Sequence, residues 1–190
     1  MGKRVAVIDC GTNTFNLLVL EIESKTDWKI IFKTKLAVKI GVGGFSENKI
    51  MPERLARALD ALASYHATAQ SLAVDEVRIF ATSAVRESKN GSELVDKVRQ
   101  LFNWEINVIS GDREAELIFE GVNQAVEERF SDYLIMDIGG GSTEFVIVKN
   151  NKAIWRKSYL MGVSRIFEWL KPSSRITNDE VLRLKNYCHK

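Results

Sequence analysis

One motif occurs twice in the chain, and this repeat constrains the fold more than any other feature. Residues 7–20 read VIDCGTNTFNLLVL and residues 135–148 read IMDIGGGSTEFVIV. Each copy consists of an apolar run that ends in Asp, a glycine-containing turn, a hydroxyl side chain and a second apolar run. Because both copies also open a run of three strands, they indicate an internal duplication. Aligned without gaps, the copies pair Asp9 with Asp137, Gly11 with Gly139, Thr14 with Ser142, and Asn16 with Glu144.

The order of the predicted elements supports two lobes with one plan. Alternating and continuous apolar runs predict three strands at 4–9, 16–22 and 28–40, a helix at 51–72, a strand near 74–82, a helix at 91–102, a strand at 105–110 and a helix at 111–130. The pattern then restarts with three strands between 133 and 160, followed by two helices. We therefore predict an α/β protein with a first lobe over residues 1–126 and the start of a second, incomplete lobe over 127–190.

Composition narrows the class of protein. The 190-residue chain has a net charge of +2 and 45% hydrophobic residues, so we expect a globular protein without a duplex nucleic-acid footprint. Its two cysteines show neither a disulfide framework nor metal-site spacing, which favours reduced thiols and a cytoplasmic location. The first apolar run is too short for a signal peptide, and no segment is long enough to span a membrane.

The two glycine turns are candidate phosphate sites. A tight turn exposes successive backbone N–H groups, and glycine leaves no Cβ atom to block a ligand. Either turn taken alone is better explained as a simple hairpin turn. Two such turns, each beside a carboxylate at the end of a strand, favour anion binding. The candidate ligands are Thr12, Asn13 and Thr14 in the first lobe, and Gly139, Gly140, Gly141, Ser142 and Thr143 in the second.

The carboxylates at the strand ends are candidate metal ligands. Asp9 and Asp137 each end an apolar run, where an unpartnered carboxylate is unfavourable. Each side chain could cap its own turn. The alternative is Mg²⁺, which prefers one or two carboxylates together with waters and substrate phosphates. Whether Glu144 faces the same site depends on the strand parity, which the sequence leaves open.

Two further segments carry residues suited to phosphate chemistry. In FATSAVRES, Ser83 and Arg86 follow a strand, and a guanidinium beside hydroxyl groups suits phosphate, although it also suits a solvated surface. In SGDREAE, Glu114 lies in the first turn of a helix, where a carboxylate stabilises the helix dipole. Asp112 and Glu116 fit that role equally well. The lysines at 29, 33, 35 and 39 fit either a solvated strand or a polyanion track, and the 39–44 loop offers further amides.

Six segments carry a family resemblance: DCGTNTFNLL, KIGVGG, ATSAVR, VISGDREAELIFEGV, DIGGGSTEF and MGVSRI, in this order. With them the chain resembles the exopolyphosphatase/guanosine pentaphosphate phosphohydrolase family. The resemblance covers nearly the whole chain. It implies a ribonuclease H-like fold of the actin, Hsp70 and sugar kinase superfamily. Members usually have a complete second lobe, so we expect this chain to be a fragment or to pair with a second copy as a homodimer.

The resemblance implies a role for each matching residue. Glu114 takes the position of the catalytic base, Arg86 meets the terminal phosphate, and Asp137 and Glu144 take the positions of acids associated with the metal and the water. The two turns take the positions of the phosphate loops, with Asp9 in the first. Thr14 and Asn16 depart from the commoner serine and basic residue, and Asn16 puts the phosphate affinity of that side in question.

These features predict a phosphohydrolase that releases terminal phosphate from inorganic polyphosphate with Mg²⁺ or another divalent cation. Guanosine pentaphosphate is the second candidate substrate. Two rival hypotheses are an ATP-dependent kinase of the same superfamily and a non-catalytic phosphate- or nucleotide-sensing module.

Overall fold

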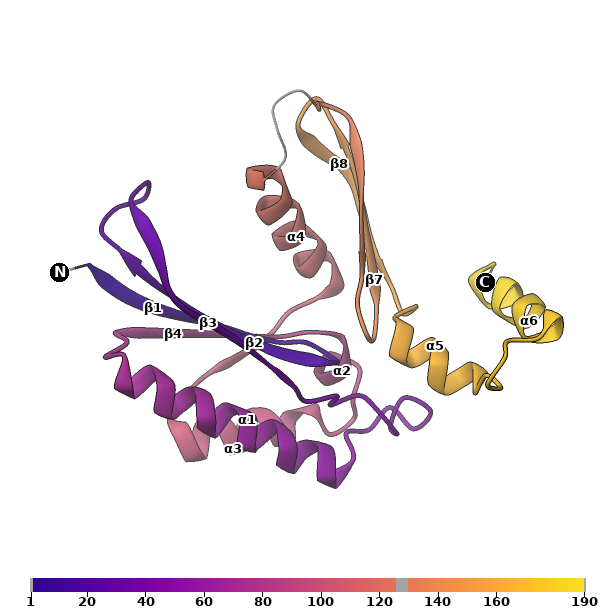
Figure 1. The fold of residues 1–190 in the computed structure, drawn as a ribbon, viewed down its shortest axis with the longest axis horizontal. Coiled ribbons are helices and arrows are strands. Elements are labelled where there is room, and N and C mark those ends of the chain that lie inside the picture. Colours follow the sequence, from indigo (N-terminus) through magenta and orange to yellow (C-terminus); the bar gives the residue numbers. More distant parts are fainter. Residues whose placement is uncertain (1, 126–129, 190) are drawn as a thin grey trace.

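A computed structural model describes residues 2–125 and 130–189 of the chain. Two sheets stand beside each other and are joined through one helix (Figure 1). The first part of the chain contains β1 (Lys3–Cys10), β2 (Thr14–Ile22), β3 (Trp28–Ala37), α1 (Pro52–Ser71), β4 (Glu76–Ala81), α2 (Ser83–Arg86), α3 (Gly91–Phe102), β5 (Ile106–Val108) and α4 (Gly111–Ala125). The second contains β6 (Tyr133–Ile138), β7 (Thr143–Lys149), β8 (Lys152–Tyr159), α5 (Val163–Leu170) and α6 (Asn178–Cys188).

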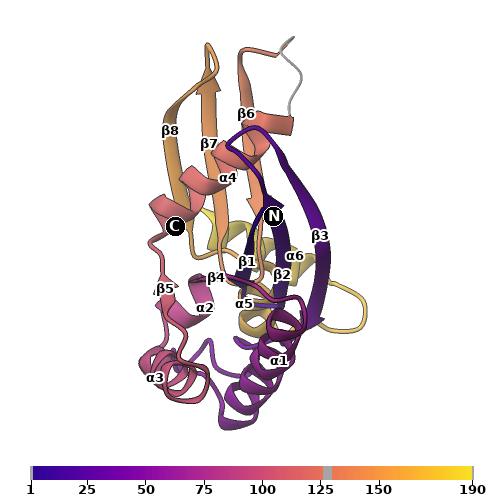
Figure 2. The same ribbon diagram turned by 90° about the vertical axis from the view of Figure 1, so that its left-hand side faces the viewer.

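The first sheet has the strand order β3-β2-β1-β4-β5. The turns between β1, β2 and β3 are short, so these strands pair antiparallel, whereas β4 and β5 follow helices and join in parallel. This confirms the predicted meander followed by crossovers and gives the arrangement of a ribonuclease H-like lobe. Helices α1 and α3 cover one face of the sheet, and α4 lies on the opposite side (Figure 2).

The period of two along β1 decides which side chains enter the core of the first lobe. Ala6, Ile8 and Cys10 are fully buried on the face that α1 and α3 cover. On the same face Tyr65 of α1 donates a 2.7 Å hydrogen bond to the carbonyl of Phe15. Asp9, at the alternate position of β1, therefore points to the opposite face, toward the second lobe.

A β-bulge divides the row of lysines on β3. The register with β2 shifts between Val19 and Leu20, so the strand parity changes there. Before the bulge Lys29 lies opposite Glu21 and forms an ion pair with it at 2.6 Å. After the bulge Lys35 lies opposite Asn16, which itself lies opposite Asp9. Directly opposite residues share a face, so Lys35 lies on the same face of the sheet as Asp9.

The second sheet repeats the meander with the order β6-β7-β8. Helix α4 packs on it, and Ala115 of α4 shares a core with Ile135, Val146 and Val148. The predicted helix over 111–130 is confirmed as far as Ala125; residues 126–129, and with them the predicted lobe boundary between 126 and 127, lie outside the described residues.

The other face of the second sheet is apolar and exposed. Leu134, Met136 and Ile138 of β6 are 60%, 54% and 53% exposed. Their counterparts in the repeat are Ala6, Ile8 and Cys10, which the helices of the first lobe bury. The same apolar pattern is therefore buried by helices in the first lobe, whereas in the second lobe it stays exposed among the described residues. Among the described residues no helix has the length and apolarity that crossing a membrane requires.

Candidate functional site

The two repeated turns have the same backbone geometry. In the first, the N–H of Gly11 donates to the carbonyl of Thr14 at 3.1 Å; in the second, the N–H of Gly139 donates to the carbonyl of Ser142 at 3.0 Å. The four residues hold equivalent positions in the sequence repeat. The predicted duplication is therefore present in hydrogen bonding as well as in the order of strands.

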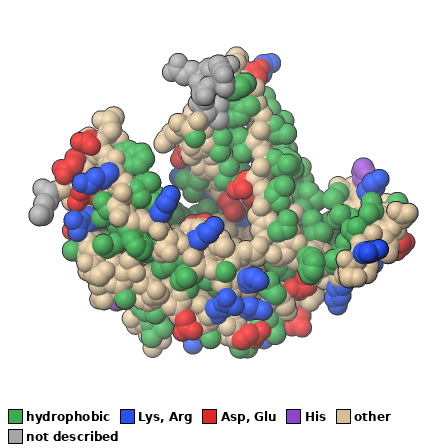
Figure 3. Space-filling view, viewed as in Figure 1, with side chains coloured by type: hydrophobic (Ala, Val, Ile, Leu, Met, Phe, Trp, Pro, Cys, Tyr) green, Lys and Arg blue, Asp and Glu red, His purple; other side chains and the backbone are tan. Residues whose placement is uncertain are grey.

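The acids at the two strand ends face one cleft. Asp9 lies opposite Asn16 and accepts a 3.0 Å hydrogen bond from its Nδ2 atom, and Asp137 lies opposite Glu144 in the same register. Burial raises the pKa of Asp9, and the nearby Asp137 carboxylate adds to that rise against the effect of Asn16. Such an effect requires each carboxylate to lie within the range of the other's charge. Acidic side chains gather in the hollow between the lobes (Figure 3).

The turns from the two lobes touch each other, and glycine makes this contact possible. A Cβ atom on Gly140 would lie 2.7 Å from the Asn13 side chain, and one on Gly141 would lie 2.6 Å from Ser83 Oγ and 2.7 Å from Thr12 Oγ1. Five of the predicted phosphate ligands are thus brought together. The Ser83 hydroxyl is buried and has no hydrogen-bond partner among the described residues, so it is available to a ligand.

The start of α5 fixes the orientation of the second turn. The N–H groups of Val163 and Ser164 donate to the carbonyls of Gly139 and Gly140 at 3.0 and 2.9 Å. Arg165 Nε donates to the carbonyl of Gly141 at 2.9 Å. In a trans peptide the C=O and the following N–H point in opposite directions.

Consequently the N–H groups of Gly140, Gly141 and Ser142 point away from α5. Among the described residues these three amides have no hydrogen-bond partner, and the same is true of the Thr12 and Asn13 amides in the first turn. Successive free amides on a turn form a concave site for an anion. The free N–H groups of both turns would therefore donate hydrogen bonds to phosphate oxygens at a predicted phosphate site.

Glu114 lies in the first turn of α4, beside Arg86 at the end of α2. Arg86 Nη1 donates to Glu114 Oε2 at 3.1 Å and to the carbonyl of Ile109 at 2.9 Å. Burial raises the pKa of Glu114 to about 7; the Glu144 carboxylate adds to the rise, and Arg86 opposes it. A carboxylate with a pKa near neutrality is suited to accept a proton at neutral pH. Its neighbours differ, since Asp112 is exposed and Glu116 pairs with Arg113.

Glu144 is the most enclosed acid of the site. Its side chain is 1% exposed and accepts a 2.7 Å hydrogen bond from Ser158 Oγ of β8. Gly111 approaches the same serine so closely that a Cβ atom there would lie 2.8 Å from Ser158 Oγ. The strand parity that the sequence left open is thus decided, because Glu144 is turned toward Glu114.

One predicted ligand, Thr143, has a side-chain partner within the protein. The Thr143 hydroxyl donates to the carbonyl of Met161 at 2.9 Å, which ties β7 to the segment before α5. Ser142 contributes a free amide, and its side chain is buried. Sequence reasoning missed the roles of Ser158 and Arg165. Arg165 lies in MGVSRI, a segment that carries the family resemblance but suggests no chemistry by itself.

The donor set is compatible with a divalent cation shared with substrate. Among residues 2–125 and 130–189, no group of three or more His, Cys, Asp or Glu side chains is arranged to hold a metal by itself. Mg²⁺ does not require such a cage, because it retains waters and uses one or two carboxylates with phosphate oxygens. Asp9 and Asp137, whose carboxylates interact electrostatically across the two lobes, fit this chemistry.

A family model described as the Ppx/GppA phosphatase family matches residues 18–190. The chain belongs to the Ppx/GppA phosphatase family. The crystal structure of an exopolyphosphatase from Cytophaga hutchinsonii matches with a TM-score of 0.93 and 38% sequence identity, over 97% of this chain and 59% of that chain. This likeness confirms the resemblance and the predicted fold class.

Relatives in the Ppx/GppA family carry more than one activity in their names. A bifunctional 3-dehydroquinate synthase/phosphatase from Fusobacterium nucleatum is 36% identical over 181 residues, which are 91% of this chain and 27% of that protein. A guanosine-5'-triphosphate,3'-diphosphate pyrophosphatase from Aeromonas hydrophila is 31% identical over 157 residues, 83% of this chain and 31% of that protein. The chain thus spans only part of the length of each relative.

Proposed function

We propose that this Ppx/GppA protein is a phosphohydrolase that removes the terminal phosphate from inorganic polyphosphate. The observation that carries the proposal is Glu114, a carboxylate with a pKa of about 7 that contacts Arg86 in a cleft with two turns of free amides. This combination supplies a proton acceptor and phosphate-binding groups at one place. It also supports the role of Glu114 that the family resemblance implied.

In the proposed reaction a water molecule attacks the terminal phosphorus in line with the bridging oxygen. A new P–O bond forms to the water oxygen, the bond from phosphorus to the bridging oxygen breaks, and the shortened chain leaves with that electron pair. Glu114 accepts the proton of the water. Enzymes catalyse such transfers mainly by positioning and by electrostatic stabilisation.

The residues around Glu114 divide the remaining tasks. Arg86 already donates to Glu114, and its guanidinium would also hold oxygens of the terminal phosphate. The amides of Gly140, Gly141 and Ser142 would donate to phosphate oxygens from the second lobe. Glu144, held by Ser158, keeps the pKa of Glu114 high and would orient the water.

A divalent cation such as Mg²⁺ would be held by Asp137 together with Asp9 or Glu144. It would reduce the negative charge of the phosphates when bound. This assignment is supported by the electrostatic interaction between Asp9 and Asp137 and by the absence of a neutralising cation beside them among the described residues.

Guanosine pentaphosphate is the second candidate substrate. The name of the Aeromonas hydrophila relative favours it, since that protein acts on a guanosine polyphosphate. Both substrates end in a phosphoanhydride, so the site described above would treat their terminal phosphates alike. The difference lies in what occupies the space beyond the second phosphate.

The test is phosphate release from long-chain polyphosphate and from guanosine pentaphosphate, with and without Mg²⁺, by wild type and by Glu114→Gln. We expect release by wild type to exceed release by the variant by about 10²-fold or more, in line with the usual contribution of a general base. A matched control is Glu116→Gln, a half-buried acid of the same helix that pairs with Arg113 rather than with Arg86. Binding of polyphosphate without turnover would instead favour a sensing module, and equal release by wild type and Glu114→Gln would remove Glu114 from the mechanism.

A further inference from the structure

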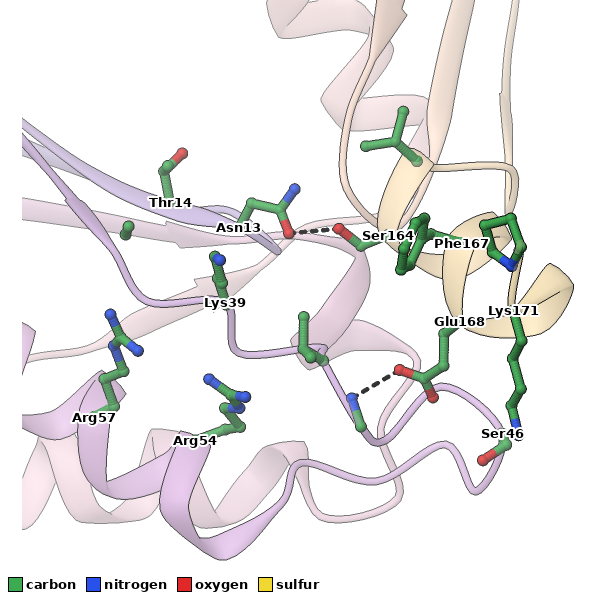
Figure 4. A pocket seen from close by; sticks show the side chains of 15 residues that line it. Asn13, Thr14, Lys39, Ser46, Arg54, Arg57, Ser164, Phe167, Glu168 and Lys171 are labelled. Atoms are coloured by element: carbon green, nitrogen blue, oxygen red, sulfur yellow. Dashed lines mark hydrogen bonds between the residues drawn. The ribbon is translucent and has the colours of Figure 1, made fainter. Parts of the chain in front are cut away.

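A large pocket with basic side chains lies next to the first-lobe turn. An open pocket of about 1150 Å³ is bordered by the start of α1, the loop that follows β3 and the helix α5. Asn13 and Thr14 of the turn line it, whereas Glu114 and Arg86 do not. Figure 4 shows Arg54 and Arg57 extending from α1 toward the same space as Lys39, with Glu168 on the opposite wall.

The charge of this pocket is strongly unbalanced. Its walls carry four cations, Lys39, Arg54, Arg57 and Lys171, and one acid, Glu168. Within the described residues none of the four cations forms an ion pair. The Nε atom of Arg54 is buried without a hydrogen-bond acceptor among these residues. A buried donor without a partner is unfavourable, so a ligand that brings acceptor oxygens would be stabilised there.

The pocket already holds one anionic group from the protein itself. The N–H groups of Gly43 and Phe45 donate to the two carboxylate oxygens of Glu168 at 2.7 and 3.0 Å. Gly43 has a φ of 83°, a conformation that glycine adopts without strain. This loop therefore has the geometry of an anion site, and the carboxylate of Glu168 occupies the position that a phosphate oxygen would take.

We propose that this pocket binds the distal phosphates of a polyphosphate chain whose terminal phosphate lies at Glu114, and that a distal phosphate displaces Glu168 from the Gly43 and Phe45 amides. Asn13 and Thr14 connect the two regions, because they belong to the first-lobe turn and also line the pocket. An excess of cations over acids fits a polyanion. The inference rests on the proposed function, so binding and hydrolysis must be measured separately.

The first experiment compares the affinity for long-chain polyphosphate with that for pyrophosphate by calorimetry. All proteins carry Glu114→Gln, which prevents shortening of the chain during titration. The double variant Arg54→Gln/Arg57→Gln should lose about tenfold or more of its affinity for the long chain, because hydrogen bonds to charged groups are lost. Affinity for pyrophosphate, which is too short to reach both regions, should stay unchanged.

The matched control is Lys97→Gln/Arg99→Gln, which removes the same charge from exposed positions on α3. An equal effect of both double variants would overturn the inference, as would a failure of the long chain to bind more tightly than pyrophosphate. Circular dichroism checks that each variant folds. The charge-conserving Arg54→Lys/Arg57→Lys variant should retain most of the affinity for the long chain, because the positive charge of the pocket is kept.

The second experiment tests the displacement of Glu168. Glu168→Gln should raise the affinity for long-chain polyphosphate several-fold, because a charged competitor is replaced by a neutral one. Glu47→Gln removes the same charge from an exposed position on the loop that carries Gly43 and Phe45, and should have a smaller effect. Equal effects, or weaker binding by Glu168→Gln, would show that Glu168 is not displaced.

The two proposals fail in different ways. Hydrolysis that depends on Glu114, with long-chain affinity independent of Arg54 and Arg57, would refute the pocket alone. Binding that depends on these arginines, without turnover by wild type, would refute the hydrolase function and leave the pocket as a polyphosphate site.

Discussion

The carboxylate of Glu144 lies close enough to Glu114 to be, after burial, the largest cause of the raised Glu114 pKa. Arg86 acts in the opposite direction. We therefore expect carboxyl-carbon NMR titration of the metal-free protein to give a Glu114 pKa of about 7. In Glu144→Gln the pKa should fall, and in Arg86→Gln it should rise. A Glu114 pKa that both substitutions leave unmoved would contradict this arrangement.

The same pKa predicts a dependence of stability on pH. The folded-state pKa of Glu114, about 7, is above its ordinary value of 4.5, so folding favours the protonated form. This contribution is fully present below about pH 4.5 and is lost as pH rises through 7, an effect of up to about 3 kcal/mol. Urea unfolding of the metal-free protein at several pH values measures it. Glu114→Gln should show a flatter profile between pH 4.5 and 7 than Glu116→Gln.

The contact between Gly140 and Asn13 predicts that a methyl group on this turn disrupts phosphate binding. In Gly140→Ala the new Cβ atom would displace the Asn13 side chain, since the two would be 2.7 Å apart. We expect affinity for pyrophosphate to fall by about tenfold, as for a lost hydrogen bond to a charged ligand. Gly121→Ala is the control, because a Cβ atom on Gly121 of α4 would meet nothing within 4 Å. That variant should bind normally and be slightly more stable.

Arg165 should act as a positioning residue for the second turn. Its Nε atom holds the Gly141 carbonyl, and its guanidinium lies over the Phe45 ring at 4.8 Å. Arg165→Gln should weaken pyrophosphate binding, because the Ser142 amide is then no longer fixed toward the cleft. Arg183→Gln removes an exposed guanidinium that lies over Trp169 and should leave binding unchanged. Backbone amide shifts of residues 140–142 should move only in the Arg165 variant.

The repeat offers a matched test of burial. Ile8 is 0% exposed and its counterpart Met136 is 54% exposed. Truncation of a fully buried aliphatic side chain lowers the free energy of unfolding by about 2–5 kcal/mol, so Ile8→Ala should be strongly destabilising. Met136→Ala should cost less than about 1 kcal/mol, as for an exposed site. Urea unfolding of both variants measures the difference, and equal losses would show that the apolar face of β6 is covered in solution.

The two lobes, the order of strands and the residues of both turns could be predicted from sequence. Their signals are local: an apolar run that ends at Asp9 or Asp137 marks the end of a strand, and a glycine two residues after each acid indicates a tight turn. The repeat added the relationship between the lobes, because equivalent residues must form equivalent hydrogen bonds. The start of α4 was also predictable. Its residue pattern alone did not choose among its three acids, and only the family resemblance pointed to Glu114.

Tertiary structure alone decided which groups face the cleft. The packing of α4 on β8 sets the rotation that turns Glu114 toward Arg86 and Glu144 and leaves Asp112 exposed. Ser158 and Arg165 acquire their roles through contacts with Glu144 and Gly141, which are not their neighbours in sequence. A sequence records the chemistry of each side chain and its local backbone preference. The distances between side chains from different elements depend on how the lobes pack, and the pKa of Glu114 follows from those distances.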